Sequence, residues 1–219
     1  NGNDTIQVTS YYNLVDGGAG NDLITSCFYD PQNGRGGNDS LYGGDGNDTL
    51  VYDAKNSVVS GGNGFDVLDG SSQTAGLNIT LGVGKYVDIE GVWGGNGAYR
   101  LIGSSYDNDL IGGADNDLLD GGVGNDSMYG GAGNDSYYVD SSGDYLYEDV
   151  SAGTDAVFSS ASFILGVDFE NLTLVGTASI SGTGNTLNNV LTGNSGNNVL
   201  SGGVGEDEIA GGSGEDTLL

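Results

Sequence analysis

The chain of 219 residues is long enough for one or two ordinary domains, but 44 of its residues are glycine, about three times the usual share. Its 31 acidic residues against 4 basic ones give a net charge of −27, which excludes nucleic acids and anionic membrane surfaces as partners. Because the chain has no histidine, Ser-His-Asp triads and histidine-based zinc sites are excluded as well.

Residues 1–76 form the first predicted section, in which a nine-residue pattern recurs. NGNDTI at the start is the end of a truncated repeat, and the full pattern appears as GGAGNDLIT at Gly17–Thr25. Between later copies, Ser26–Asn33 is one residue short and contains Pro31, which is typical of a loosened half-coil. The further copies in this section are Gly34–Tyr42, Gly43–Val51 and Gly61–Asp69.

A stretch without the glycine pattern, residues 77–93, follows and is predicted to join two repeat sections. Its apolar residues alternate as they do in strands. The second section, residues 94–158, contains three nonapeptides with no residue between them, GGADNDLLD, GGVGNDSMY and GGAGNDSYY. Tyr99 and Asn108 occupy the position of the aspartate in its first two repeats. We interpret Tyr99, together with Trp93 and Tyr106, as closing the end of an apolar core rather than as a binding patch.

Residues 159–183 are again strand-like and are predicted to join the second section to a third, residues 184–219. The third section keeps the nine-residue phase but has Asn189 and Asn198 where aspartate is expected. Asparagine is neutral, and stacked asparagines form amide ladders. We therefore predict that these coils hold themselves together with little or no metal, before Asp207 and Asp216 restore the acidic pattern.

One nonapeptide predicts half a coil. Paired glycines permit a tight turn with positive φ, and the three residues after it form a short strand with one buried side chain at position eight. Two units, 18 residues, then make one coil, and turns two units apart stack on the same edge. No stretch shows the apolar period of a helix. The predicted fold class is therefore all-β, a parallel β-roll or β-solenoid with metal-poor coils between the repeat runs.

Phase counting predicts which aspartates share an edge. When Ser26–Asn33 is counted as one half-coil, Asp4, Asp22 and Asp39 fall on one edge. Asp48 and Asp66 then fall on the other edge.

Aspartates at position six are the candidate metal ligands, because stacked turns place their carboxylates and bare carbonyl oxygens in one column. Hard oxygens without histidine or thiolate pairs select a hard cation, and the flexible geometry favours Ca²⁺ over Mg²⁺. Turn-forming aspartate is the alternative reading of single copies, and it weighs most for the isolated members Asp4 and Asp155. The other candidates are Asp22, Asp39, Asp48, Asp66, Asp117, Asp126, Asp135, Asp144, Asp207 and Asp216.

GGVGNDSMY and GGAGNDSYY resemble the RTX, or haemolysin-type, calcium-binding nonapeptide. The resemblance implies a parallel β-roll with several Ca²⁺ ions between successive turns, and export from bacteria by type I secretion to the cell surface or medium. It also implies that turn carbonyls complete the metal shell, at Gly18, Gly20, Gly44, Gly46, Gly62, Gly64, Gly122, Gly124, Gly131 and Gly133.

Calcium is expected to decide whether the chain folds. The single cysteine, Cys27, cannot form an internal disulfide, so a secreted form needs another source of stability. Sites saturated tenfold above their Kd add roughly 1.4 kcal/mol each, and about six would give on the order of 8 kcal/mol, comparable to a whole domain's stability. We expect a loose chain where calcium is scarce and a folded one outside the cell.

Three functions stay open at this point. The first is a calcium-binding repeat segment of a larger secreted or cell-surface protein, since the chain begins and ends inside repeats. The second is a structural segment of an S-layer, filament or adhesin, with self-assembly. The third is the accessory region of an extracellular hydrolase or polysaccharide-modifying enzyme whose catalytic residues lie elsewhere. The chain itself is not expected to be an enzyme, because paired acids such as Asp107/Asp109 and Asp115/Asp117 lie on repeat turns where nothing converges on them. No apolar run reaches the ~20 residues of a membrane span, so no membrane insertion is expected.

Overall fold

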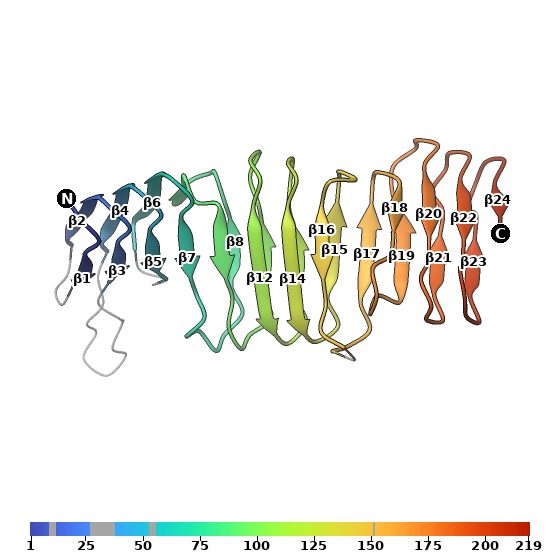
Figure 1. Cartoon of the computed structure of the whole chain (residues 1–219), viewed down its shortest axis with the longest axis horizontal. Coiled ribbons are helices and arrows are strands. Elements are labelled where there is room, and N and C mark those ends of the chain that lie inside the picture. The colour runs from blue at the N-terminus through green and yellow to red at the C-terminus, as the bar shows by residue number, and fades with distance from the viewer. Residues whose placement is uncertain (9–11, 27–37, 53–55, 151) are drawn as a thin grey trace.

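The computed structural model describes residues 1–8, 12–26, 38–52, 56–150 and 152–219. All regular elements in these ranges are short strands, and they pair in parallel. Figure 1 shows the coils following one another along a single long axis, with the two termini at opposite ends. The predicted all-β solenoid is confirmed. The described residues include no helix with the length and apolar character needed to cross a membrane.

Two long sheets run along most of the molecule, one on each side of the core. The first sheet consists of β1 (Thr5–Gln7), β3 (Leu23–Thr25), β5 (Thr49–Val51), β7 (Val67–Asp69), β10 (Gly91–Trp93), β12 (Asp109–Ala114), β14 (Ser127–Ala132) and β16 (Tyr145–Tyr147). The second sheet consists of β8 (Asn78–Thr80), β11 (Arg100–Ile102), β13 (Leu118–Asp120), β15 (Ser136–Val139), β17 (Ala156–Ser159), β19 (Asn171–Leu174), β21 (Val190–Thr192) and β23 (Glu208–Ala210).

Two four-stranded sheets complete the walls at the ends of the solenoid. The third sheet, at the N-terminal end, consists of β2 (Leu14–Ala19), β4 (Ser40–Asp45), β6 (Val58–Asn63) and β9 (Tyr86–Val87). The fourth sheet, at the C-terminal end, consists of β18 (Phe163–Ile164), β20 (Ser181–Thr183), β22 (Val199–Ser201) and β24 (Thr217–Leu218).

Most strands pair with the strand 18 residues further along the chain. Thr5 pairs with Leu23 and Asp109 with Ser127, which confirms that two nonapeptides make one coil. Every strand contributes one central side chain to the interior, and these residues stack in register. Leu119, Met128 and Tyr137, at position eight of the three contiguous repeats, are at most 1% exposed. A fully buried side chain of this size contributes about 1.5–3 kcal/mol relative to exposure, so each coil adds a comparable increment.

The stretches that lack the repeat pattern are hydrogen-bonded to repeats on both sides. β10 pairs with β7 and β12, and β19 pairs with β17 and β21. The glycine pattern is absent at 77–93 because the coil there contains three strands, β8, β9 and β10, that belong to three different sheets. The third sheet ends in this coil and the second sheet begins.

The edge assignment predicted from phase counting is wrong. β3 pairs with β5, so that Leu23 lies opposite Thr49 at a separation of 26 residues instead of 18. Asp4, Asp22, Asp48 and Asp66 therefore stack on one edge, whereas Asp39 lies on another. The eight extra residues do not advance the coil by half a turn. Most of Ser26–Asn33, which was counted as a half-coil, lies outside the described residues.

The interpretation of three aromatic residues is right for only one of them. Tyr99 is 2% exposed and its hydroxyl donates to the carbonyl of Gly70, so it does belong to the core. Trp93 and Tyr106 are 37% and 70% exposed. Trp93 is the last residue of β10, where strand alternation turns it to the outer face while Val92 fills the interior.

Candidate metal-binding columns

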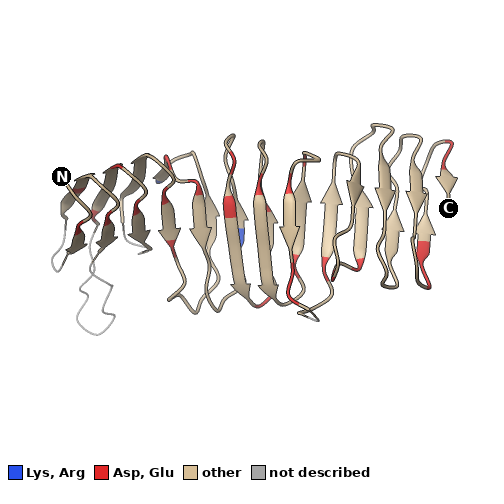
Figure 2. Cartoon of the chain, in the orientation of Figure 1, with Lys and Arg blue, Asp and Glu red and all other residues tan. Residues whose placement is uncertain are grey.

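One polar residue stands directly before most strands of the two long sheets, and successive coils stack these residues into columns. Figure 2 shows the acidic residues gathered at the ends of strands and in the turns along the solenoid. The first column precedes the strands of the first sheet and consists of Asp4, Asp22, Asp48, Asp66, Glu90, Asn108, Asp126 and Asp144. The second column precedes strands of the second sheet and consists of Tyr99, Asp117, Asp135, Asp155, Glu170, Asn189 and Asp207.

A hydrogen-bond ladder runs along each column. The backbone N–H of Asp22 donates to Oδ1 of Asp48, and that of Asp48 donates to Oδ1 of Asp66, both at 2.7 Å. In the second column the N–H of Asp117 donates to Asp135 Oδ1 at 2.7 Å, and the N–H of Asp135 to Asp155 Oδ1 at 2.8 Å. Each of these carboxylates therefore has one oxygen held by the preceding coil.

The second carboxylate oxygen is buried and has no hydrogen-bond partner in seven position-six aspartates. A buried charged oxygen without a partner costs several kcal/mol, and seven in one repeat position point to a missing cation. The set consists of Oδ2 of Asp22, Asp39, Asp48, Asp66, Asp117, Asp126 and Asp135.

Glycines shape the space around these free oxygens. A Cβ added to Gly43 would lie less than 3.0 Å both from Asp48 Oδ2 and from the carbonyl oxygen of Gly61 in the next coil. The carboxylate oxygen and the carbonyl oxygen thus converge on the same small space, and any side chain at position one would fill it. Hard oxygens are the ligands that Ca²⁺ takes, at flexible coordination numbers. The residues present fit that ion.

The ten glycines that the sequence marks as carbonyl donors all have positive φ, between 84° and 159°. Their carbonyls point toward the next coil: the carbonyl oxygens of Gly18 and Gly20 lie under Gly44 and Gly46. Asp115 takes the position-four conformation without being glycine, with φ of 67°. An aspartate tolerates this left-handed region better than most residues.

Burial and mutual repulsion raise the pKa values of the column carboxyls. The pKa of Asp117 rises to about 7, and the pKa values of Asp66 and Asp126 rise to about 6. Loss of hydration is the largest cause in each case, and the neighbouring carboxylate of the same column adds to it. A bound divalent cation would counter both effects.

These shifts predict opposite pH dependences with and without calcium. In chelator, the folded chain binds protons more tightly than the unfolded one, whose carboxyl pKa values are about 4. The electrostatic cost is therefore complete above pH ~7 and is relieved as the pH falls through ~6, so stability in chelator should rise between pH ~8 and ~5. In saturating calcium, protons compete with the cation and stability should fall over that range. Urea unfolding followed by circular dichroism measures both. The same slope in both media would contradict the account.

Asparagine replaces the cation where it occupies a column. The side-chain amide of Asn189 donates to the carbonyls of Phe169 and Glu170 at 3.0 and 3.2 Å, and that of Asn108 donates to the carbonyl of Glu90 at 3.1 Å. An N–H group thus satisfies the turn carbonyls of the preceding coil. The predicted ladder between asparagine side chains is wrong, because Asn198 precedes a strand of the fourth sheet, on another edge from Asn189.

The structure unites some predicted ligands and separates others. Asp39 stands apart from both columns and accepts the backbone N–H of Asn13. Asp207 and Asp216 accept the N–H groups of Asn189 and Asn198 but are only partly buried. Asp155, an isolated copy after a two-residue insertion, is 1% exposed and lies within the second column.

Two glutamates in the columns escaped the sequence analysis. Glu90 and Glu170 accept the N–H groups of Asp66 and Asp155 at 2.9 and 2.8 Å. Both lie outside any glycine repeat, in the strand-like stretches. The available signal was an acidic residue directly before a short apolar strand, the relation that every position-six aspartate has to its own strand.

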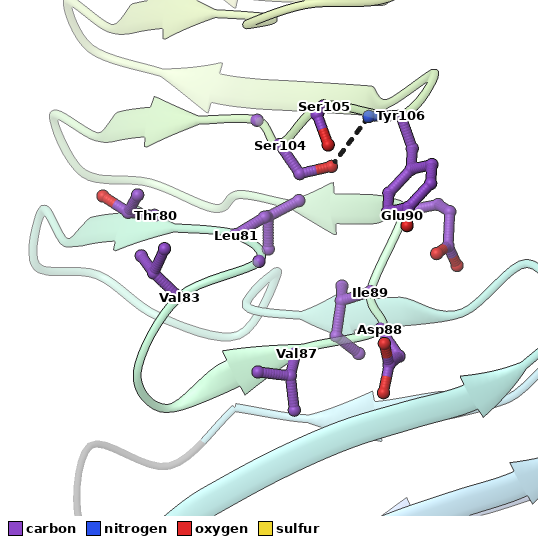
Figure 3. Close-up of a pocket in the computed structure, with 12 residues that line it drawn as sticks. Thr80, Leu81, Val83, Val87, Asp88, Ile89, Glu90, Ser104, Ser105 and Tyr106 are labelled. Carbon is purple, nitrogen blue, oxygen red and sulfur yellow. Dashed lines mark hydrogen bonds between the residues drawn. The ribbon is translucent and has the colours of Figure 1, made fainter.

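A groove of about 550 Å³ lies beside the coil where the sheets change. Figure 3 shows Leu81 and Ile89 in its apolar part, with Asp88, Glu90 and Tyr106 also lining it. Asp88 accepts a long hydrogen bond of 3.4 Å from the Ser60 hydroxyl. The groove therefore reaches the first column at the point where aspartate gives way to glutamate.

Comparison with known families agrees with this geometry. The family model described as the RTX calcium-binding nonapeptide repeat (4 copies) matches residues 1–26, 33–56, 53–73, 102–137 and 183–218, together more than half of the chain. No curated protein matches it. The matched segments include nine of the ten position-six aspartates put forward as metal ligands, all except Asp144. The chain belongs to the RTX calcium-binding nonapeptide repeat family.

Proposed function

We propose that this chain is a calcium-binding repeat segment of a larger secreted or cell-surface bacterial protein, and that it folds on Ca²⁺ after type I secretion. The observation that carries the proposal is the set of seven buried Oδ2 atoms without a partner. They recur at one position of the repeat, beside stacked turn carbonyls. RTX repeats are typical of secreted bacterial proteins, which supports the location. On this proposal any catalytic activity belongs to other parts of the parent protein.

The charge of the chain explains why calcium would act as the switch. With 31 acidic and 4 basic residues, the columns have few cations of their own to balance them. Intracellular free calcium is far below the ~10⁻⁴–10⁻³ M at which extracellular modules bind. The ion-free chain would stay loose during export and would fold where calcium is abundant, because binding to the folded state alone stabilises it.

A structural role on the cell surface is the second candidate, and the asparagine coils favour it. Side-chain amides of Asn185, Asn189, Asn194 and Asn198 all donate to backbone carbonyls of the preceding coil. Such coils satisfy their turns without metal. They would give a permanently folded section of a filament or adhesin, while calcium stiffens the rest.

Calcium titration followed by far-ultraviolet circular dichroism tests the proposal. We expect a largely unfolded spectrum in chelator and a cooperative gain of β signal near millimolar calcium, with no such gain in magnesium, which demands a tighter octahedron. A β spectrum already complete in chelator would contradict metal-coupled folding. It would favour the structural role instead.

A further inference from the structure

We infer that Glu148 converts one gap of the second column into a three-carboxylate calcium site with higher affinity than the other gaps. The inference rests on the proposed calcium-binding function and assigns the order in which its sites fill. Its ligands are Asp135, Glu148 and Asp155, each of which offers one carboxylate oxygen within 4.8 Å of the others. They are 1%, 4% and 1% exposed.

Glu148 occupies the place that glycine has in the neighbouring repeats. The strands β14 and β16 pair in register, so that Gly130 and Glu148 each directly follow the Tyr129–Tyr147 pair. A Cβ added to Gly130 would lie less than 3.0 Å from Asp135 Oδ2 and 2.6 Å from Glu148 Oε1. The side chain of Glu148 therefore enters the space in which ordinary repeats have only one carboxylate and carbonyl oxygens.

Free oxygens point to a ligand at this cluster. Glu148 Oε2 and Asp135 Oδ2 are buried and have no hydrogen-bond partner. The other oxygen of Glu148 accepts the hydroxyl of Tyr137, which in turn accepts the N–H of Gly130 at 2.6 Å. Tyr137 is fully buried against Phe169, with ring centroids 5.4 Å apart. The phenol thus fixes Glu148 with one oxygen still available.

The gap directly before it provides an internal comparison. Asp117 and Asp135 form that gap with two carboxylates, and glycines occupy position one in its two turns. A third carboxylate adds a formal charge and a side-chain ligand that needs no further ordering, and calcium affinity rises with both. We therefore expect the site at Glu148 to bind calcium about tenfold more tightly than the two-carboxylate gaps.

Isothermal titration calorimetry of the full 219-residue chain with calcium tests the inference. The variants are Glu148→Gln, which removes the charge but keeps the size, and Asp149→Asn, which makes the same charge change at the next, exposed residue. We expect a tight first equivalent in the wild type and in Asp149→Asn, and its loss in Glu148→Gln. Glu148→Gly, which restores the repeat glycine, should fold and also lack the tight phase. Circular dichroism in saturating calcium verifies folding of each variant.

Terbium luminescence sensitised by tyrosine gives a second readout. Tb³⁺ bound at this site lies beside Tyr137, so the first equivalent should give strong emission that Tyr137→Phe reduces while the calorimetric phase remains. If Glu148→Gln and Asp149→Asn titrate alike while calcium still binds elsewhere, the inference is overturned and the proposed function stands. If none of the proteins binds calcium, both are overturned.

Discussion

Replacing Gly44 with alanine is expected to destabilise the N-terminal coils by more than about 3 kcal/mol even in saturating calcium. Gly44 has φ of 116°, and an added Cβ would lie less than 3.0 Å from the backbone carbonyl oxygen of Gly18 in the coil before it. Alanine has to leave that conformation and also has to push two stacked backbones apart. Guanidinium unfolding followed by circular dichroism measures the loss.

Gly18 is the matched control for Gly44. It occupies the same position of the repeat with φ of 97°, but nothing lies within 4 Å of an added Cβ. Gly18→Ala should therefore lose only the conformational part, about 1–3 kcal/mol. Equal losses in the two variants would show that the stacking of turn backbones carries no weight of its own.

Replacing Asp117 with asparagine is expected to change stability in opposite directions with and without calcium. In chelator at pH ~8 the variant should be more stable than the wild type, by on the order of 1–3 kcal/mol, because a buried carboxyl that resists ionisation becomes neutral. In saturating calcium it should be less stable, because a charged ligand is lost. Unfolding curves in chelator and in calcium give both values. A loss of stability in both media would contradict the cation account.

Asn189→Asp is the reciprocal change in the same column. It removes the amide that donates to the carbonyls of Phe169 and Glu170 and places a carboxylate there instead. Stability in chelator should fall by about 1–3 kcal/mol, and calcium should recover part of it. The two substitutions together ask whether an amide and a cation do the same work at this position.

The period of the sequence predicts the solenoid because each rule is local. Glycine at fixed positions sets the turn, and one apolar residue in nine sets the inward face, so Leu119, Met128 and Tyr137 could be placed without knowledge of the rest. The ten predicted glycines adopt positive φ for the same reason. These features depend only on residues inside one repeat.

Relations between coils were harder to predict, because they depend on lengths that one repeat does not reveal. Eight residues between Asp22 and Asp48 are either a short half-coil or an addition to a full one, and the local sequence is the same in both cases. Glu148 was overlooked for a related reason: it stands at a glycine position, and a search by glycine phase passes over it. Its role appears only when Asp135 and Asp155 are stacked beside it.

The most direct test of the central claim is to locate the ions in a crystal grown with terbium in place of calcium, from anomalous diffraction. The account predicts density beside the free Oδ2 atoms of Asp22, Asp48, Asp117 and Asp126, and none beside Asn189. Density that is absent from both columns, or equally strong beside the asparagine, would contradict the claim that the carboxylate columns are the calcium sites.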